Sequence, residues 1–124
     1  MSLILGVAGG GALGALSRYG IDTLVERRSE SVFPWATFLI NASGCLAVGF
    51  IIAALVDRHR APQWLRTGLV MGFCGGFTTF STFAQETLNL VEEGDNKIAL
   101  ATVLANVILG IVAVFVGARL GRLV

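Results

Sequence analysis

Residues 72–83, with the sequence GFCGGFTTFSTF, place two adjacent glycines and four hydroxyl residues inside a long hydrophobic stretch. Glycine costs a helix about 1 kcal/mol relative to alanine, and serine and threonine compete for backbone hydrogen bonds. This segment therefore predicts a break in a hydrophobic helix. In a membrane, non-helical backbone persists only where it is buried in protein or lines a cavity. The carbonyl groups that such a break frees could hold a hard cation.

The sequence on either side of this segment is also hydrophobic. The chain has 124 residues, of which 55% are hydrophobic and 14% charged, and its mean hydropathy is +0.79. This composition excludes a water-soluble globule and a disordered chain. A transmembrane helix needs about 20 mostly apolar residues. The predicted fold is an all-α integral membrane protein of one domain, with four transmembrane helices and a broken third helix, at approximately residues 2–25, 32–56, 65–91 and 98–120.

The charges lie mainly in the predicted loops, and their net value is only +1 with no basic cluster, which argues against a nucleic-acid partner. Four spans place both termini on one side of the membrane. That side carries five basic residues, and the other carries three, or four if Arg18 reaches it: Arg58, Arg60, Arg66, Arg119 and Arg122 against Arg27, Arg28 and Lys97. Because the Lys/Arg asymmetry sets orientation, this weak bias permits insertion both ways round and an antiparallel dimer. A slight preference for cytoplasmic termini is the alternative.

Two stripes of small residues lie in the first and third hydrophobic segments. Glycine recurs every fourth residue at 6, 10 and 14 and again at 68, 72 and 76. Such stripes let helix backbones approach closely. Four tightly packed helices leave little room for a water-filled path inside one subunit, so an interface between copies is the more natural place for transport. We therefore expect a homodimer.

Residues with catalytic or cofactor chemistry form no recognisable constellation in this sequence. Residues 9–14 match G-x-G-x-x-G, but no strand can precede them, so helix packing is the expected role. Cys45 and Cys74 lie in separate spans without a C-x-x-C partner, and they are expected to be buried apolar thiols. His59 lies in a charged loop and is assigned no role. We expect no enzymatic activity.

Several polar side chains lie at membrane depth, where they are costly and usually face protein or a wet cavity. Arg18 and Asp22 are four residues apart on one helix face, either as an interfacial pair or as a cation at the mouth of an anion path. Asn41 lies near the middle of the second span. Its side chain either makes an interhelical hydrogen bond that holds the fold or donates an N–H to an anion. Asn106 in the fourth span, one turn after Thr102, leaves the same alternatives open.

Phe80 and Phe83 are three residues apart and share one helix face. Aromatic rings have a positive edge, so ring edges can solvate a small anion without trapping it as a lysine would. Apolar packing is the alternative for this pair. Their position beside the glycine pair and the four hydroxyl residues favours a pore.

Three motifs together resemble the Fluc/CrcB family of bacterial fluoride channels. They are the glycine-rich first span ending in GALSRY at residues 14–19, Asn41-x-x-Gly44 in the second span, and GGFTTFSTF at residues 75–83. The resemblance covers essentially the whole chain. It implies an antiparallel, dual-topology homodimer in the bacterial inner membrane, with two parallel fluoride pathways that are each lined by both subunits.

The resemblance also implies a role for each matching residue. The fluoride pathway would comprise the aromatic pair, a polar donor in the vestibule and a polar track that continues into the fourth span: Phe80 and Phe83, Asn41, then Ser81, Thr82 and Asn106. Arg18 would be a structural cation below the vestibule. The backbone carbonyls of Gly75 and Thr78 from both subunits would bind a structural Na⁺ on the dimer axis.

Two other functions fit the length and the four predicted spans. A small four-span coupled multidrug or cation exporter shares the dimer and the dual topology, but such a transporter is expected to use a carboxylate in the membrane core. The charge-free core of the first span has none, and Glu86 lies toward the end of the third. A non-transporting helical assembly subunit would explain the glycine stripes without a path. Passive fluoride export remains the favoured function.

Overall fold

The computed structural model describes residues 1–57 and 60–124, and all regular elements in these ranges are helices. Arg58 and His59, which the sequence analysis assigned to a charged loop, lie outside the described residues. The all-helical class predicted from the sequence is confirmed. The elements, with π-helical segments labelled η, are α1 (Ser2–Glu26), α2 (Trp35–Ile51), η1 (Ile52–Val56), α3 (Gln63–Thr67), η2 (Gly68–Cys74), α4 (Gly75–Phe77), α5 (Phe80–Glu92), α6 (Asn96–Leu104), η3 (Ala105–Leu109) and α7 (Gly110–Gly121).

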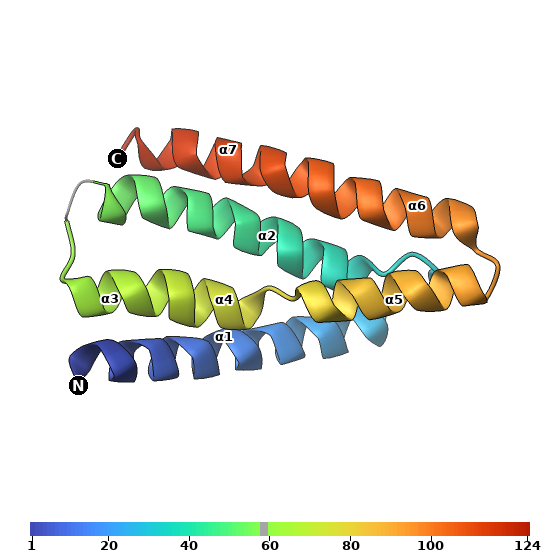
Figure 1. Ribbon diagram of the computed structural model, residues 1–124, viewed down its shortest axis with the longest axis horizontal. Coiled ribbons are helices and arrows are strands. Elements are labelled where there is room, and N and C mark those ends of the chain that lie inside the picture. Colours follow the sequence, from blue (N-terminus) through green and yellow to red (C-terminus); the bar gives the residue numbers. More distant parts are fainter. Residues whose placement is uncertain (58–59) are drawn as a thin grey trace.

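These elements form four rods that run roughly alongside one another, and both termini lie at the same end of the bundle (Figure 1). The first rod is α1, the second is α2 with η1, the third runs from α3 through η2 and α4 to α5, and the fourth is α6, η3 and α7. The first rod packs against η2 and α4 of the third, and α2 packs along α7. Two of the described helices, Trp35–Val56 and Asn96–Gly121, are long and apolar enough to cross a membrane. Because one turn of helix rises about 5.4 Å, each of them is long enough for about 30 Å of hydrocarbon.

The two glycine stripes predicted from the sequence lie against each other inside a single chain. A Cβ atom added at Gly10 would collide with the carbonyl oxygen of Gly68, and one added at Gly14 would collide with that of Phe73. From the opposite side, a Cβ on Gly76 would lie 2.7 Å from the carbonyl oxygen of Gly11. The stripes therefore join α1 to the third rod, and the prediction that they support a dimer does not follow from them.

A second close approach joins α2 to α7. A Cβ at Gly49 would collide with the Val114 carbonyl oxygen, and one at Gly117 would collide with that of Leu46. Since larger residues at these positions would push the backbones apart, glycine fixes the spacing of both helix pairs in the bundle.

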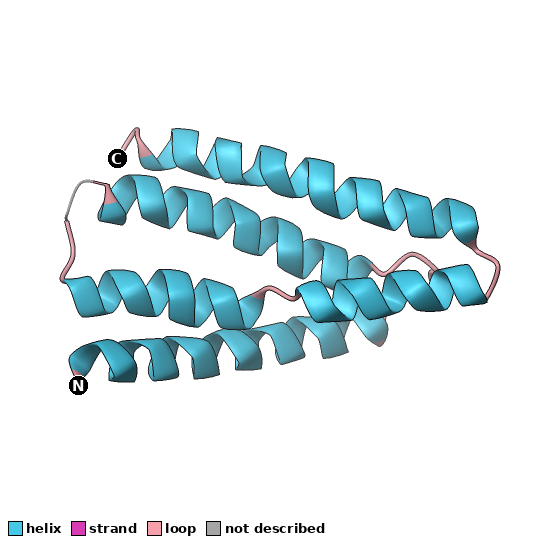
Figure 2. Cartoon of the chain, in the orientation of Figure 1, coloured by secondary structure: helices cyan, strands magenta, loops and turns pink. Residues whose placement is uncertain are grey.

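The third rod is interrupted after α4. Thr78 (φ −75°, ψ 158°) and Thr79 (φ −146°, ψ 116°) are extended, and α5 begins at the next residue, Phe80. Figure 2 shows this interruption as a short loop between two helices of the rod. Gly75 and Gly76 remain helical within α4. Two of the four hydroxyl residues, Thr78 and Thr79, rather than the glycine pair, therefore adopt the non-helical backbone.

Candidate functional site

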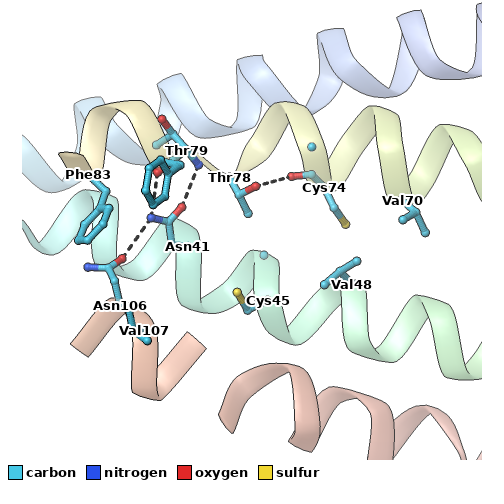
Figure 3. A pocket seen from close by; sticks show the side chains of 13 residues that line it. Asn41, Cys45, Val48, Val70, Cys74, Thr78, Thr79, Phe83, Asn106 and Val107 are labelled. Atoms are coloured by element: carbon cyan, nitrogen blue, oxygen red, sulfur yellow. Dashed lines mark hydrogen bonds between the residues drawn. The ribbon is translucent and has the colours of Figure 1, made fainter. Parts of the chain in front are cut away.

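A cavity of about 410 Å³ lies beside the interruption, between α2, the third rod and the middle of the fourth rod. Most of its lining is apolar and includes Val48, Val70 and Val107. Its polar side chains come from Asn41, Thr78, Thr79 and Asn106. Figure 3 shows these side chains gathered around the point where the third rod is interrupted. The cavity thus brings together residues that are far apart in the sequence.

The carboxamide of Asn41 bonds both backbone groups of Thr79. The Thr79 N–H donates to Asn41 Oδ1 at 2.8 Å, and Asn41 Nδ2 donates to the Thr79 carbonyl oxygen at 3.1 Å. Asn41 Nδ2 also donates to Asn106 Oδ1 at 3.1 Å. Because an amide nitrogen carries two hydrogens, these two bonds use the whole donor capacity of Asn41.

Thr79 is buried, and its side chain begins the next helix. Its Oγ1 accepts a hydrogen bond from the Thr82 N–H at 3.2 Å, as an N-cap residue does, and it donates to Thr82 Oγ1 at 2.9 Å. A buried backbone group without a partner is costly, so these bonds and those to Asn41 stabilise the extended conformation. The sequence analysis noted Thr79 as one of the four hydroxyl residues of its segment, but it did not predict that Thr79 caps the next helix.

The N–H groups of Thr79 and Thr82 bond side chains, and two backbone carbonyls therefore lack their usual helical donors. In a continuous α-helix the Thr79 N–H would bond the Gly75 carbonyl, and the Thr82 N–H would bond that of Thr78. Here these donors bond Asn41 Oδ1 and Thr79 Oγ1 instead. Gly75 and Thr78 both line the cavity. They are the two residues whose carbonyls the resemblance assigns to a cation.

Arg18 approaches the interruption from α1. Its Nη1 donates to the Thr78 carbonyl oxygen at a long 3.4 Å, and its side chain is half-buried. Arg18 is not among the residues that line the cavity. Its contact is therefore with the backbone of the interruption, on which a guanidinium can stabilise a carbonyl that has lost its helical donor.

The rings of Phe80 and Phe83 contact each other, with centroids 5.6 Å apart and planes tilted by 57°. Both line the cavity. They differ in burial, because Phe83 is 8% exposed whereas Phe80 is 79% exposed within one chain. The aromatic pair predicted from the sequence is thus brought together, but a single chain encloses only one of its two rings.

Ser81 and Thr82, which the resemblance assigns to a polar track, are exposed and do not line this cavity. Thr82 Oγ1 instead accepts the bond from Thr79, and Ser81 Oγ lies 3.5 Å from Thr79 Oγ1. Within one chain these two hydroxyl residues therefore lie on the outside of the first turn of α5.

The position of Gly44 gives a structural reason for the three-residue spacing of the motif Asn41-x-x-Gly44. It lies about one turn beyond Asn41 on α2, and a Cβ there would collide with the Thr78 side-chain methyl and lie 3.2 Å from the Phe77 ring. Asn41 therefore bonds the backbone of the interruption while Gly44 leaves room for its side chains.

One polar contact in the middle of α5 was not predicted. Thr37, which is 1% exposed, donates from Oγ1 to Glu86 Oε1 at 2.8 Å, and Glu86 Oε2 is buried without a hydrogen-bond partner among the described residues. The sequence alone gave no reason to pair two residues 49 positions apart.

Comparison with known proteins gives consistent results. The model of the family described as "CrcB-like protein, Camphor Resistance (CrcB)" matches residues 5–118. The "Fluoride-specific ion channel FluC" of Dehalococcoides mccartyi (strain CBDB1) is 43% identical over 123 residues, which are 99% of this chain and 95% of that protein. The protein of the same name from Paracoccus denitrificans (strain Pd 1222) is 46% identical over 118 residues, which are 95% of this chain and 93% of that protein.

Proposed function

The chain belongs to the CrcB family, and from that membership we propose that it is a fluoride-specific ion channel. The observation that carries this function is the aromatic pair Phe80 and Phe83 on the wall of a cavity beside interrupted helical backbone. The same segment carried the resemblance in the sequence. The comparisons lend no support to the alternative of a coupled multidrug exporter.

Fluoride is small, strongly hydrated and a strong hydrogen-bond acceptor, so a selective path has to replace its water. Amide N–H groups and positive ring edges can do so without a permanent cation that would hold the ion. In this cavity the candidate donors are carboxamide groups, because the hydroxyls of Thr78 and Thr79 already donate to the Cys74 carbonyl and to Thr82 Oγ1. The candidate ring edges belong to Phe80 and Phe83. Chloride is larger and gains less from such contacts. Both the narrowness of the path and the strength of its electrostatic contacts therefore favour fluoride.

We propose that the working unit is an antiparallel homodimer with two pores. Phe80 is 79% exposed on the wall of the cavity, so a single chain leaves the aromatic pair open on one side. A second copy that packs on this face would enclose the ring and complete each path with residues from both subunits. Ser81 and Thr82, which are exposed in one chain, would then be available to line the part of the path between the subunits.

The direction of transport follows from the chemistry of the ion. In acidic surroundings fluoride enters a cell as neutral HF and dissociates in the cytoplasm. A passive, multi-pass channel in the bacterial inner membrane would let the ion leave down its gradient, aided by an inside-negative potential. Toxic fluoride would thereby be exported without coupling to ATP hydrolysis or to the transport of another ion.

We also propose a structural Na⁺ at the dimer axis. The carbonyls of Gly75 and Thr78 fit a hard cation, because their usual helical donors are diverted to Asn41 and Thr79 and both residues lie on the cavity wall. Each subunit would supply both carbonyls, and the ion would join the two interruptions. Arg18 already donates to the Thr78 carbonyl at 3.4 Å, and a carbonyl oxygen has a second lone pair to offer.

The direct test is fluoride efflux from liposomes that contain the purified full-length chain. We expect rapid efflux that needs only a gradient and a counter-ion pathway, and much slower chloride efflux from matched vesicles. Efflux that requires a proton or cation gradient, or equal loss of chloride, would contradict the proposal.

A further inference from the structure

A second cavity lies far from the interruption, at the end of the bundle that carries both termini (Figure 1). It has a volume of about 360 Å³ and lies between the end of the second rod and the start of the third. Its polar lining comes from Gln63, Arg66 and Thr67. Its apolar lining includes Ile52, Val70 and Met71. We call this cavity the Arg66 groove.

The Arg66 groove lies where the uncharged parts of both rods begin. Residues 32–56 and 67–85 carry no charged side chain, so Asp57 and Arg66 are the charges that border the hydrocarbon on these rods. Trp64 lies two residues before Arg66 and is 46% exposed, and tryptophan is enriched at the boundary between membrane and water. The groove therefore spans the level of the lipid headgroups and of the adjoining acyl chains.

The side chains of the third rod change from polar to apolar with depth in this groove. Gln63, Arg66 and Thr67 are three or four residues apart and share one helix face. Val70 and Met71 continue this face about 6 Å deeper, because a helix rises about 1.5 Å per residue. Met71 is 70% exposed. This order matches a phospholipid, which has a charged headgroup above apolar chains, and does not match a small hydrophilic anion.

The guanidinium of Arg66 has few partners in the structure. Its Nη1 donates to the Val56 carbonyl oxygen at a long 3.4 Å, and its Nε is buried without a hydrogen-bond partner among the described residues. No carboxylate in residues 1–57 and 60–124 forms an ion pair with it. A guanidinium has five N–H donors in a planar fork that fits the oxygens of a phosphate. Because Arg66 is half-buried, its charge lacks both full hydration and an anion.

Two further donors lie beside this charge. Neither the Gln63 carboxamide nor the Thr67 hydroxyl makes a side-chain hydrogen bond within the described part of the chain. The same end of the bundle also carries three more arginines, at 60, 119 and 122, and in the described segments there Asp57 is the acidic side chain against them. Basic pockets between membrane helices attract anionic headgroups. The polar part of the groove therefore fits a phosphate group, and the apolar part favours a phosphate that carries acyl chains.

We propose that the Arg66 groove binds an anionic phospholipid. Arg66, Gln63 and Thr67 hold the phosphate, and one acyl chain lies on Val70 and Met71. The lipid thereby joins the end of the second rod to the start of the third. This site is separate from the cavity beside the interruption and does not depend on the proposed transport function.

Native mass spectrometry of the full-length chain, stripped of lipid in detergent, tests this proposal. We expect one phosphatidylglycerol molecule bound per subunit, with several-fold weaker binding of zwitterionic phosphatidylcholine. Inorganic phosphate in tenfold excess should not displace the lipid, because it cannot use the apolar lining. Equal binding of the two lipids overturns the proposal. Displacement by inorganic phosphate also overturns it, because the groove would then be a site for the free ion.

Substitution of Arg66 shows whether the bound lipid occupies this groove. In Arg66→Gln, binding of phosphatidylglycerol should weaken about tenfold, as for the loss of a hydrogen bond to a charged group. Arg119→Gln is the matched control, because it makes the same charge change at the same end of the bundle but outside the groove, where the guanidinium lies 5.0 Å from the Phe115 ring centre. Unchanged binding in Arg66→Gln, or an equal loss in both variants, overturns the site.

Two other outcomes are also decisive. If the glutamine variant does not fold, Arg66→Lys keeps the charge without the planar fork and should bind phosphatidylglycerol several-fold more weakly; unchanged binding contradicts the proposal. A smaller dimer fraction in Arg66→Gln, with no phosphatidylglycerol bound to the unmodified chain, would overturn it by assigning the guanidinium to a contact with a second copy.

Discussion

At the scale of single residues, the two rings of the aromatic pair differ in burial, which their spacing in the sequence could not show. Phe83 is buried within its own chain, whereas Phe80 projects from the bundle with most of its surface exposed. Since a large exposed ring on a cavity wall contacts either lipid, a second copy or the ion, Phe80 depends on the assembly in a way that Phe83 does not.

We predict that Phe80→Ile and Phe83→Ile each lower fluoride efflux about tenfold, because each removes a positive ring edge from the path. Both variants should still assemble as dimers on size-exclusion chromatography. Only Phe83→Ile should also lower the thermal unfolding midpoint, because only this ring packs inside the chain.

The matched control for these variants is Phe115→Ile. Phe115 is 58% exposed on α7, does not line the cavity, and has the guanidinium of Arg119 at 5.0 Å from its ring centre. Its loss should leave fluoride efflux unchanged. Efflux at the unmodified rate in both Phe80→Ile and Phe83→Ile would remove the aromatic path.

At the scale of elements, glycine determines how closely the rods approach, and the interruption determines where their backbone groups point. Gly10 and Gly14 of α1 lie against the backbone of the third rod. Gly44 of α2 lies against the side chains at the interruption. Close approach therefore allows short polar side chains such as Asn41 to reach the Thr79 backbone from a neighbouring rod.

We predict that Gly10→Ala destabilises the fold of each subunit, by about 1–3 kcal/mol, because the new methyl group would collide with the Gly68 carbonyl oxygen. Gly20→Ala in the same helix is the control, because a Cβ there meets no atom within 4 Å and alanine favours the helix. Thermal unfolding in detergent, followed together with the oligomeric state, measures both effects.

The same experiment tests where the glycine stripe acts. If the stripe joined two copies, Gly10→Ala would yield folded monomers with an unchanged unfolding midpoint. Since the stripe lies inside the chain, we expect a lower midpoint without a separate step of dissociation.

At the scale of the whole molecule, one chain leaves the candidate site open on one side. The cavity beside the interruption holds freed carbonyls, carboxamides and two aromatic rings, and it opens on the face where Phe80 is exposed. A path through a membrane has to be enclosed along its length, so the proposed second subunit would pack on this face.

We predict that the dimer depends on Na⁺. When Na⁺ is replaced throughout purification by N-methyl-D-glucamine, a cation too large for a site built from carbonyls, the unfolding midpoint and the dimer fraction should fall. Because a ligand that binds only the folded dimer stabilises it by mass action, the midpoint should rise again as Na⁺ is titrated back. A midpoint that does not depend on the cation would exclude the Na⁺ site while leaving the fluoride path untested by that result.

The sequence by itself determined the helical class, the membrane environment and the family. These depend on composition and on runs of residues that are continuous in the chain, and the transfer of apolar side chains out of water is nearly independent of their partners. The hydroxyl-rich segment was also visible as an unusual string within a hydrophobic stretch. Its physical meaning, a cost to helical backbone, follows from local propensities alone.

Only the tertiary structure decided which groups meet. Asn41 bonds Thr79 and Asn106, which are 38 and 65 residues away, and the glycine stripes pair within one chain instead of between copies. It also placed Ser81 and Thr82 outside the cavity and Asn106 inside it. Hydrogen bonds depend on distance and direction to within a few tenths of an ångström. Such geometry arises from how the rods pack, and no pattern along the chain records it.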